Sequence, residues 1–354
     1  MRNNVNINVR HGFATSPLLL LAMTLIQSFL KWARCGCAAA VMSGLALGNA
    51  LAADGVATAD YPNRPLRFVV PFTPGALNDL LARLIGEQLG NRLGQRVIVD
   101  NRPGAGTIIG SDLVAKSTPD GHTLLLASAP LAINPSLYPK LPFDAARDLA
   151  GVTQIGALPF VIVCNPKFSA TSIKELVALA KAKPGQLSYG ATVSGQLMVE
   201  MFKSAAQVDI VHIPYKGLAP AMTDVIGGQI HLTLGTHSSL GPQIKAGRLR
   251  ALAVTSKART RTAPDIPTIA EAGYKDFDAT TWYGVSVAGR TPKNIVARLH
   301  SEIAAILKQP EMDRRLAAEG VDVIASRPEE LDRLIRSETV KWAKVIKEAG
   351  IKGE

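Results

Sequence analysis

Aromatic residues are scarce in this chain, and its positive charges are scattered. Phe, Trp and Tyr make up 5% of the 354 residues, and no run contains five consecutive Lys or Arg residues, although the net charge is +11. A nucleic-acid binder normally gathers basic and aromatic side chains on one surface. The composition therefore favours a basic globular protein of about two domains, whose charge helps to attract small anions.

The short motifs of common enzyme classes are also absent. The chain has no G-x-x-x-x-G-K-[ST], H-E-x-x-H, G-x-S-x-G or C-x-x-C motif, and its histidines do not fall at metal-ligand spacing. The segment Gly104-Ala-Gly106-Thr-Ile-Ile-Gly110 imitates a dinucleotide-binding loop, but its third glycine comes one position late. The next strand ends in Ser128 instead of an acid that would hold a ribose, so a structural turn is favoured. We predict no catalytic residue, no metal ligand and no cofactor.

Acidic residues are missing from the first 53 positions. The pattern of this segment indicates a secretory signal. Two apolar runs, 17–30 and 35–47, are separated by basic residues and followed by an A-x-A cleavage site at 50–52. Neither run has the 18 or so residues of a spanning helix. Residues 1–52 are therefore expected to be removed on export to the periplasm, with Met23 as a possible true start. Export would leave Cys164 as the one cysteine, a buried thiol without an intrachain disulfide.

Strand and helix patterns alternate along the rest of the chain, which indicates α/β units with mostly parallel sheets flanked by helices. The first strand is the apolar run Leu66–Val70. Thr73–Asp79 then forms a Pro-Gly turn that opens a helix. Ligands of open α/β sheets bind beyond the carboxyl ends of the strands, where the free N–H groups of helix starts favour an anion. This first loop is thus a candidate anion site.

Similar loops follow at 128–134, 191–195, 215–217 and 235–239, all rich in small and hydroxyl residues. None contains an arginine, and Lys216 is their single Lys or Arg, so backbone N–H groups, hydroxyls and water would hold an anion. Asp79 could be a catalytic carboxylate, but an acid in the first turn of a helix explains it more simply. The predicted ligand-binding residues are Thr73, Pro74, Gly75, Ala76, Asn78, Asp79, Ser128, Ala129, Asn134, Ala191, Thr192, Ser194, Gly195, Tyr215, Lys216 and His237.

Several longer segments point to one family. They are Tyr61–Arg67, Val70–Gly75, Asp100–Gly106, Asp120–Leu126, Ala132–Pro135, Val211–Gly217, Lys245–Thr255 and Pro264–Gly273. Together they closely resemble the Bug family, also called TctC-like, the extracytoplasmic solute receptors of tripartite tricarboxylate transport. The resemblance runs from about residue 61 to 351.

The resemblance implies a two-lobed periplasmic binding protein of the type II-like class, with a ligand cleft between the lobes. Residues 54–163 and 285–354 would form one lobe and 164–284 the other. A small carboxylate would be the ligand, delivered to a membrane transporter by a monomer that is not an enzyme and binds no nucleic acid. Two alternatives stay open, namely a ligand sensor that presents its bound form to a membrane signalling partner, and a periplasmic enzyme.

Three positions depart from the family pattern. Ala76 and Gly235 stand where the family usually has a glycine and an acid, respectively. The loop that follows Tyr189 is shorter than usual, and Gln196 takes the place of a histidine. These changes concern the loops that would hold the ligand, so a loss or a shift of specificity is expected more than a change of fold.

Overall fold

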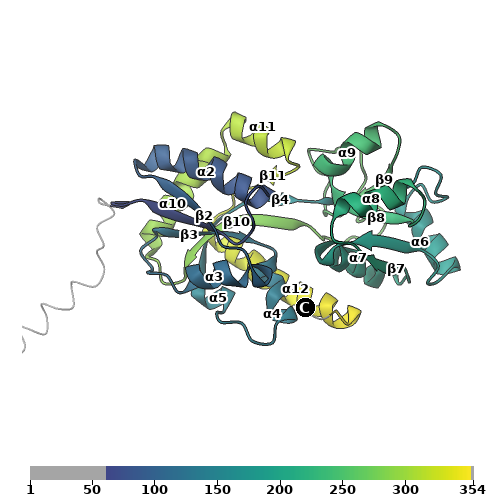
Figure 1. Ribbon diagram of the computed structural model, residues 1–354, viewed down its shortest axis with the longest axis horizontal. Helices are drawn as coiled ribbons and strands as arrows, with labels where there is room; N and C mark the ends of the chain where they lie inside the picture. Colours follow the sequence, from purple (N-terminus) through teal and green to yellow (C-terminus); the bar gives the residue numbers. More distant parts are fainter. Residues whose placement is uncertain (1–60, 352–354) are drawn as a thin grey trace, which may run out of the picture. The chain divides into compact units, whose positions relative to one another are not determined.

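A computed structural model describes residues 61–351 of the chain. The predicted signal segment, residues 1–52 with the possible start at Met23, lies outside the described residues. Within 61–351 no helix combines the length and the apolar character that crossing a membrane requires. The elements of this part build two β-sheets, each with helices on both faces (Figure 1).

The first sheet has the strand order β11-β4-β10-β3-β1-β2. Its parallel part consists of β1 (Leu66–Val70), β2 (Val97–Asn101) and β3 (Thr123–Ser128). The long strand β10 (Thr281–Ala288) pairs antiparallel with both β3 and β4 (Leu149–Leu158), and the short β11 (Asp322–Val323) closes the edge beside β4. Four of the six strands therefore run one way and two the other.

Side chains of β1 alternate between the two faces of this sheet, as the period of a strand requires. Phe68 and Val70 point to the core formed with α2 (Leu77–Leu93), α10 (Lys293–Leu307) and α11 (Pro310–Ala318). Val69 points to the opposite core, formed with α3 (Ile108–Ala115), α4 (Pro130–Leu137) and the C-terminal helix α12 (Pro328–Ala349). The 3-10 turn η2 (Ala105–Thr107) and α5 (Ala145–Asp148) complete this part.

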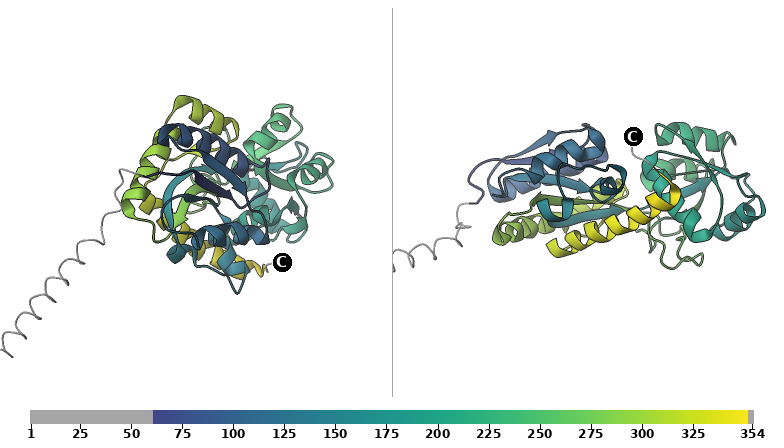
Figure 2. Two further views of the ribbon diagram at one scale, coloured as in Figure 1. Left: turned by 60° about the vertical axis from the view of Figure 1, so that its left-hand side comes forward. Right: turned by 90° about the horizontal axis from the view of Figure 1, so that it is seen from below.

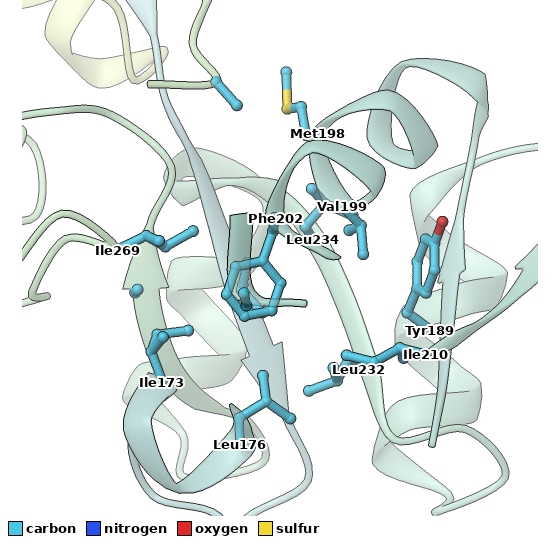
Figure 3. Packing of buried hydrophobic residues seen from close by; sticks show 14 of the residues in the cluster. Ile173, Leu176, Tyr189, Met198, Val199, Phe202, Ile210, Leu232, Leu234 and Ile269 are labelled. Carbon is cyan, nitrogen blue, oxygen red and sulfur yellow. The ribbon is translucent and has the colours of Figure 1, made fainter. Parts of the chain in front are cut away.

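The second sheet has the order β7-β6-β8-β5-β9. Its strands are β5 (Phe160–Cys164), β6 (Ser188–Ala191), β7 (Val211–Pro214), β8 (Leu232–Thr236) and β9 (Arg250–Val254). On one face α6 (Ile173–Ala182) and α7 (Val193–Ala206) cover a core centred on Phe202, Tyr189 and Leu234 (Figure 3). On the other face lie α8 (Leu218–Ile226) and α9 (His237–Lys245). Cys164 is free and fully buried in the first of these cores, and burial raises the pKa of its thiol to about 11.

The chain passes between the sheets at points that differ slightly from the predicted ones. All of β5 pairs with β8 and β9 in the second sheet, so the first switch falls at Pro159 and not at 163–164. All of β10 pairs with β3 and β4, so the return falls just before Thr281 and not at 284–285. A single proline separates β4 from β5, because it interrupts an apolar run that otherwise reads as one strand.

The helix α12 makes a third connection between the two sets of elements (Figure 2). Leu331 and Ile335 in its first half belong to a core of the first sheet. Trp342 and Ile346 in its second half belong to the core of the second sheet that contains Phe202. A single helix thus buries residues in the hydrophobic cores of both sheets.

Candidate ligand cavity

Residues from both sheets line one cavity of about 360 Å³. This volume is at the small end of the range for small-molecule sites, about 300–1,000 Å³. The lining consists of Phe72, Leu77, Asn78, Ser128, Pro130, Leu158, Phe160, Ser194, Met198, Thr236, Ser238, Ser239, Thr281, Tyr283 and Glu319. Two larger hollows, of about 640 and 560 Å³, lie beside the second half of α12 and between α4–α5 and α12. Among residues 61–351, no strand end contributes to either of them.

Four helices begin at this cavity. Leu77 and Asn78 are the first residues of α2, and Pro130 is the first residue of α4. Ser194 lies in the first turn of α7, and Ser238 and Ser239 lie in that of α9. The first N–H groups of a helix have no partner within it and carry a partial positive charge. The topology therefore directs positive helix ends from both sheets toward one space.

Three of these helix starts have no side-chain cap. The N-cap residues Ala76 of α2, Ala129 of α4 and Thr192 of α7 make no capping hydrogen bond through their side chains. Of the three, α4 begins with Pro130, which has no backbone N–H to offer. By contrast, Thr236 caps α9, because its hydroxyl oxygen accepts from the amide of Ser239 at 3.3 Å. The amides at the starts of α2 and α7 are thus the stronger anion donors of the cavity.

The turn before α2 is held in place from within the first sheet. Gly75 has φ +87°, in the left-handed region that favours glycine. Its amide donates to Asp79 Oδ2 at 3.0 Å, and Asp79 also accepts from Arg83 Nε at 2.9 Å and from Asn101 Nδ2 at 3.0 Å. The amide N–H of Gly75 is thus already hydrogen-bonded to the buried Asp79 carboxylate and is not free to bind a ligand. Its main role is to position the start of α2.

We expect Asp79→Asn to destabilise the protein by about 1–2 kcal/mol at pH 7. The hydrogen bond from Arg83 is the main cause that lowers the pKa of Asp79 from 3.8 to about 2. Because Arg83 is exposed, solvent screening reduces the stabilisation that this ion pair contributes. Because the pKa is lower in the folded state, this stability is present above pH 4 and is lost as the pH falls toward 2. Urea unfolding at pH 7 and pH 3 should show a smaller pH dependence in the variant. An equal dependence in both proteins would contradict the prediction.

The second sheet contributes hydroxyls and a sulfur to the cavity. The Thr236 hydroxyl also bonds the hydroxyls of Ser238 at 3.0 Å and Ser239 at 2.9 Å. Met198 both lines the cavity and belongs to the core of the second sheet, one helical turn before Phe202 (Figure 3). This part of the lining is therefore anchored to a packed core, which limits its movement.

Of the predicted binding residues, the structure places Asn78, Ser128 and Ser194 in the cavity lining. The others lie at strand ends, in loops or in helices and are not part of the lining. They are Thr73, Pro74, Gly75, Ala76, Asp79, Ala129, Asn134, Ala191, Thr192, Gly195, Tyr215, Lys216 and His237. Besides Asp79, two of these polar side chains bond to neighbouring residues on their own side of the cavity. Asn134 donates to the Gly106 carbonyl at 2.8 Å, and Tyr215 donates to the Asp224 carboxylate.

Sequence reasoning missed most of the apolar part of the lining, together with Glu319. Leu158 and Phe160 flank the switch between the sheets, and Tyr283 lies on β10, where strand patterns alone give no sign of a cavity. Thr236, Ser238 and Ser239 lie in the loop 235–239, which the sequence predicts as a strand end, although only His237 of that loop is predicted to bind. At Gly235 the absence of a side chain leaves space for Leu218, since a Cβ there would lie 2.4 Å from Leu218 Cδ2.

Two α/β sheets that share a small cavity at their strand ends define a two-lobed solute-binding protein. Comparison with known sequences and structures agrees with this class. The chain belongs to the tripartite tricarboxylate transporter family of receptors, whose model matches residues 81–351. The predicted Bug or TctC-like resemblance is thereby confirmed, and the protein is a solute-binding receptor.

Individual relatives support the same assignment. The chain is 37% identical to protein BugT of Bordetella pertussis over 314 residues, which cover 87% of this chain and 96% of BugT. An R. palustris structure with adipate is 34% identical, has a TM-score of 0.69, and matches over 83% of this chain and 100% of its own. The structure of MatC from Rhodopseudomonas palustris with bound malate is 27% identical, with a TM-score of 0.64, over 81% of this chain and 100% of its own.

Proposed function

We propose that this receptor is a periplasmic, non-enzymatic protein that captures a small carboxylate and presents it to a tripartite tricarboxylate-type transporter. The observation that carries the proposal is the convergence of two uncapped helix starts, α2 and α7, on a small cavity. Adipate and malate, the ligands of two similar proteins, are both carboxylates.

Binding would use dipoles and hydroxyls in place of a cationic side chain. Among the described residues that line the cavity there is no Lys, Arg or His. The carboxylate would accept hydrogen bonds from the amides of Leu77, Asn78 and Ser194 and from the Ser128 hydroxyl. Such bonds are strong because the acceptor is charged, and closure of the lobes would strengthen them by excluding water.

The two sheets would act as lobes that close on the ligand. Within the described residues we place the lobes at 61–159 and 281–351, and at 160–280, in keeping with the strands that each sheet contains. Closure would bring Asn78 and Ser128 of one lobe and Ser194 of the other around one anion. The remaining predicted residues would support these loops from outside the cavity. The receptor would act as a monomer.

A thermal-shift panel of carboxylic acids tests the proposal. Each acid is paired with its neutral amide of the same shape, and the purified protein is heated with each compound. A ligand present at about 100 times its Kd should add about 2.7 kcal/mol, which raises the melting temperature by several degrees. We expect shifts from acids and not from their amides. Equal shifts from both, or chemical turnover of the ligand, would contradict the proposal.

A further inference from the structure

Among the described residues that line the cavity, Glu319 is the one that carries a charge. It follows the C-terminal end of α11, where the helix dipole adds a negative partial charge of its own. Its carboxylate makes no ion pair or hydrogen bond within residues 61–351. The cavity thus has one negative side chain and no cation to balance it.

Glu319 lies next to the start of α9, which makes that helix start less suitable for an anion than the starts of α2 and α7. The Ser238 hydroxyl donates to the Glu319 carbonyl at 3.2 Å, which places Glu319 beside the start of α9. That start is already capped by Thr236. An anion is therefore disfavoured near α9, by the negative charge and by the occupied cap. The uncapped starts of α2 and α7 remain for it.

Apolar side chains make up much of the rest of the lining. Phe72, Leu158, Phe160 and Met198 offer carbon and sulfur surfaces to whatever the carboxylate carries. Burying an alkyl or aryl group against them is favourable in proportion to the apolar area removed from water. A second carboxylate would lose its hydration against these apolar side chains, which costs free energy. It would also be repelled by the negative charge of Glu319, with no cation nearby to offset the repulsion.

We propose that this cavity selects carboxylates with a single negative charge and an apolar body, and that Glu319 is the residue that rejects a second carboxylate. This inference rests on the proposed function, because it presumes a carboxylate at the starts of α2 and α7. The receptor would then differ in specificity from the relative solved with adipate, a dicarboxylate.

Matched acids test this by isothermal titration calorimetry. The pairs are hexanoate with adipate, octanoate with suberate, and phenylacetate with 4-carboxyphenylacetate, which differ mainly in the second carboxylate. We expect the monoacid of the best-binding pair to bind at least about tenfold more tightly than its diacid, equivalent to about 1.4 kcal/mol. Glu319→Gln should reduce this ratio at least threefold. Glu87→Gln, the same change at an exposed position outside the cavity lining, should leave it unaltered.

A second measurement uses only the wild-type protein, so it does not depend on whether the Glu319→Gln variant folds. It compares the Kd of the diacid with that of its monomethyl ester. The monomethyl ester of the preferred diacid has one charge and nearly the same length, so it should bind about as well as the monoacid. Equal binding of monoacid and diacid, or an unchanged ratio in a folded Glu319→Gln protein, would overturn the inference while leaving the proposed function intact. If no acid of either kind binds, the proposed function fails and this inference fails with it.

Discussion

Ser194→Asp should weaken carboxylate binding at least about 100-fold, or about 2.7 kcal/mol. Ser194 lies in the first turn of α7, is exposed, and lines the cavity. A carboxylate fixed at this position would interact with the free amides of the helix start that the ligand needs. It would also repel the negative ligand, since like charges brought together cost several kcal/mol.

The same substitution should leave the fold intact or stabilise it slightly. An acid in the first turn of a helix interacts favourably with the dipole, by about 0.3–1 kcal/mol. The melting temperature without ligand should therefore stay the same or rise, so that lost binding cannot be attributed to unfolding. This separates an effect on the site from an effect on stability.

Ser194→Asn is the matched control, because asparagine has the size of aspartate without its charge. We expect it to change the Kd by no more than about threefold. Both variants can be titrated with the best acid from the thermal-shift panel. If Ser194→Asp binds as tightly as the wild type, the carboxylate does not lie at the start of α7. Asn78→Asp then tests the start of α2 in the same way.

Much of the fold could be predicted from the sequence because its signals are local. The strand at Leu66–Val70 and the helix start near Asn78 follow from an apolar run, a Pro-Gly turn and the spacing of leucines. The switch between the sheets was misplaced because the run around Pro159 is apolar on both sides. Which strand belongs to which sheet depends on pairing between distant segments, which periodicity does not encode.

The candidate site was predictable only in part, for a similar reason. Ser128 ends β3, and Asn78 and Ser194 lie at the starts of the helices that follow β1 and β6. The rule that ligands bind beyond the strand ends is sufficient to select all three. Glu319 lies at the end of a helix far along the chain from these loops and belongs to no recognisable motif. It reaches the cavity through the packing of α11 against the first sheet. The charge that we expect to set specificity is therefore visible only in three dimensions.

Trp342→Ala should lower the free energy of unfolding by about 3–5 kcal/mol. The indole is 2% exposed and packs in the core of the second sheet, while α12 begins in a core of the first. Its Nε1–H also donates to the buried Glu338 carboxylate at 2.7 Å. Removing the ring leaves a void and takes one donor from Glu338, although the ion pair of Glu338 with Lys341 remains.

Val340→Ala provides the control on the same helix. Val340 is 73% exposed, so its truncation should change the free energy of unfolding by less than about 0.5 kcal/mol. Urea denaturation followed by circular dichroism measures both variants. Because α12 contributes to both sets of cores, we expect Trp342→Ala to shift one cooperative transition to lower urea. A loss below about 1 kcal/mol, or a separate early transition of the second sheet alone, would show that α12 does not couple the stability of the two sheets.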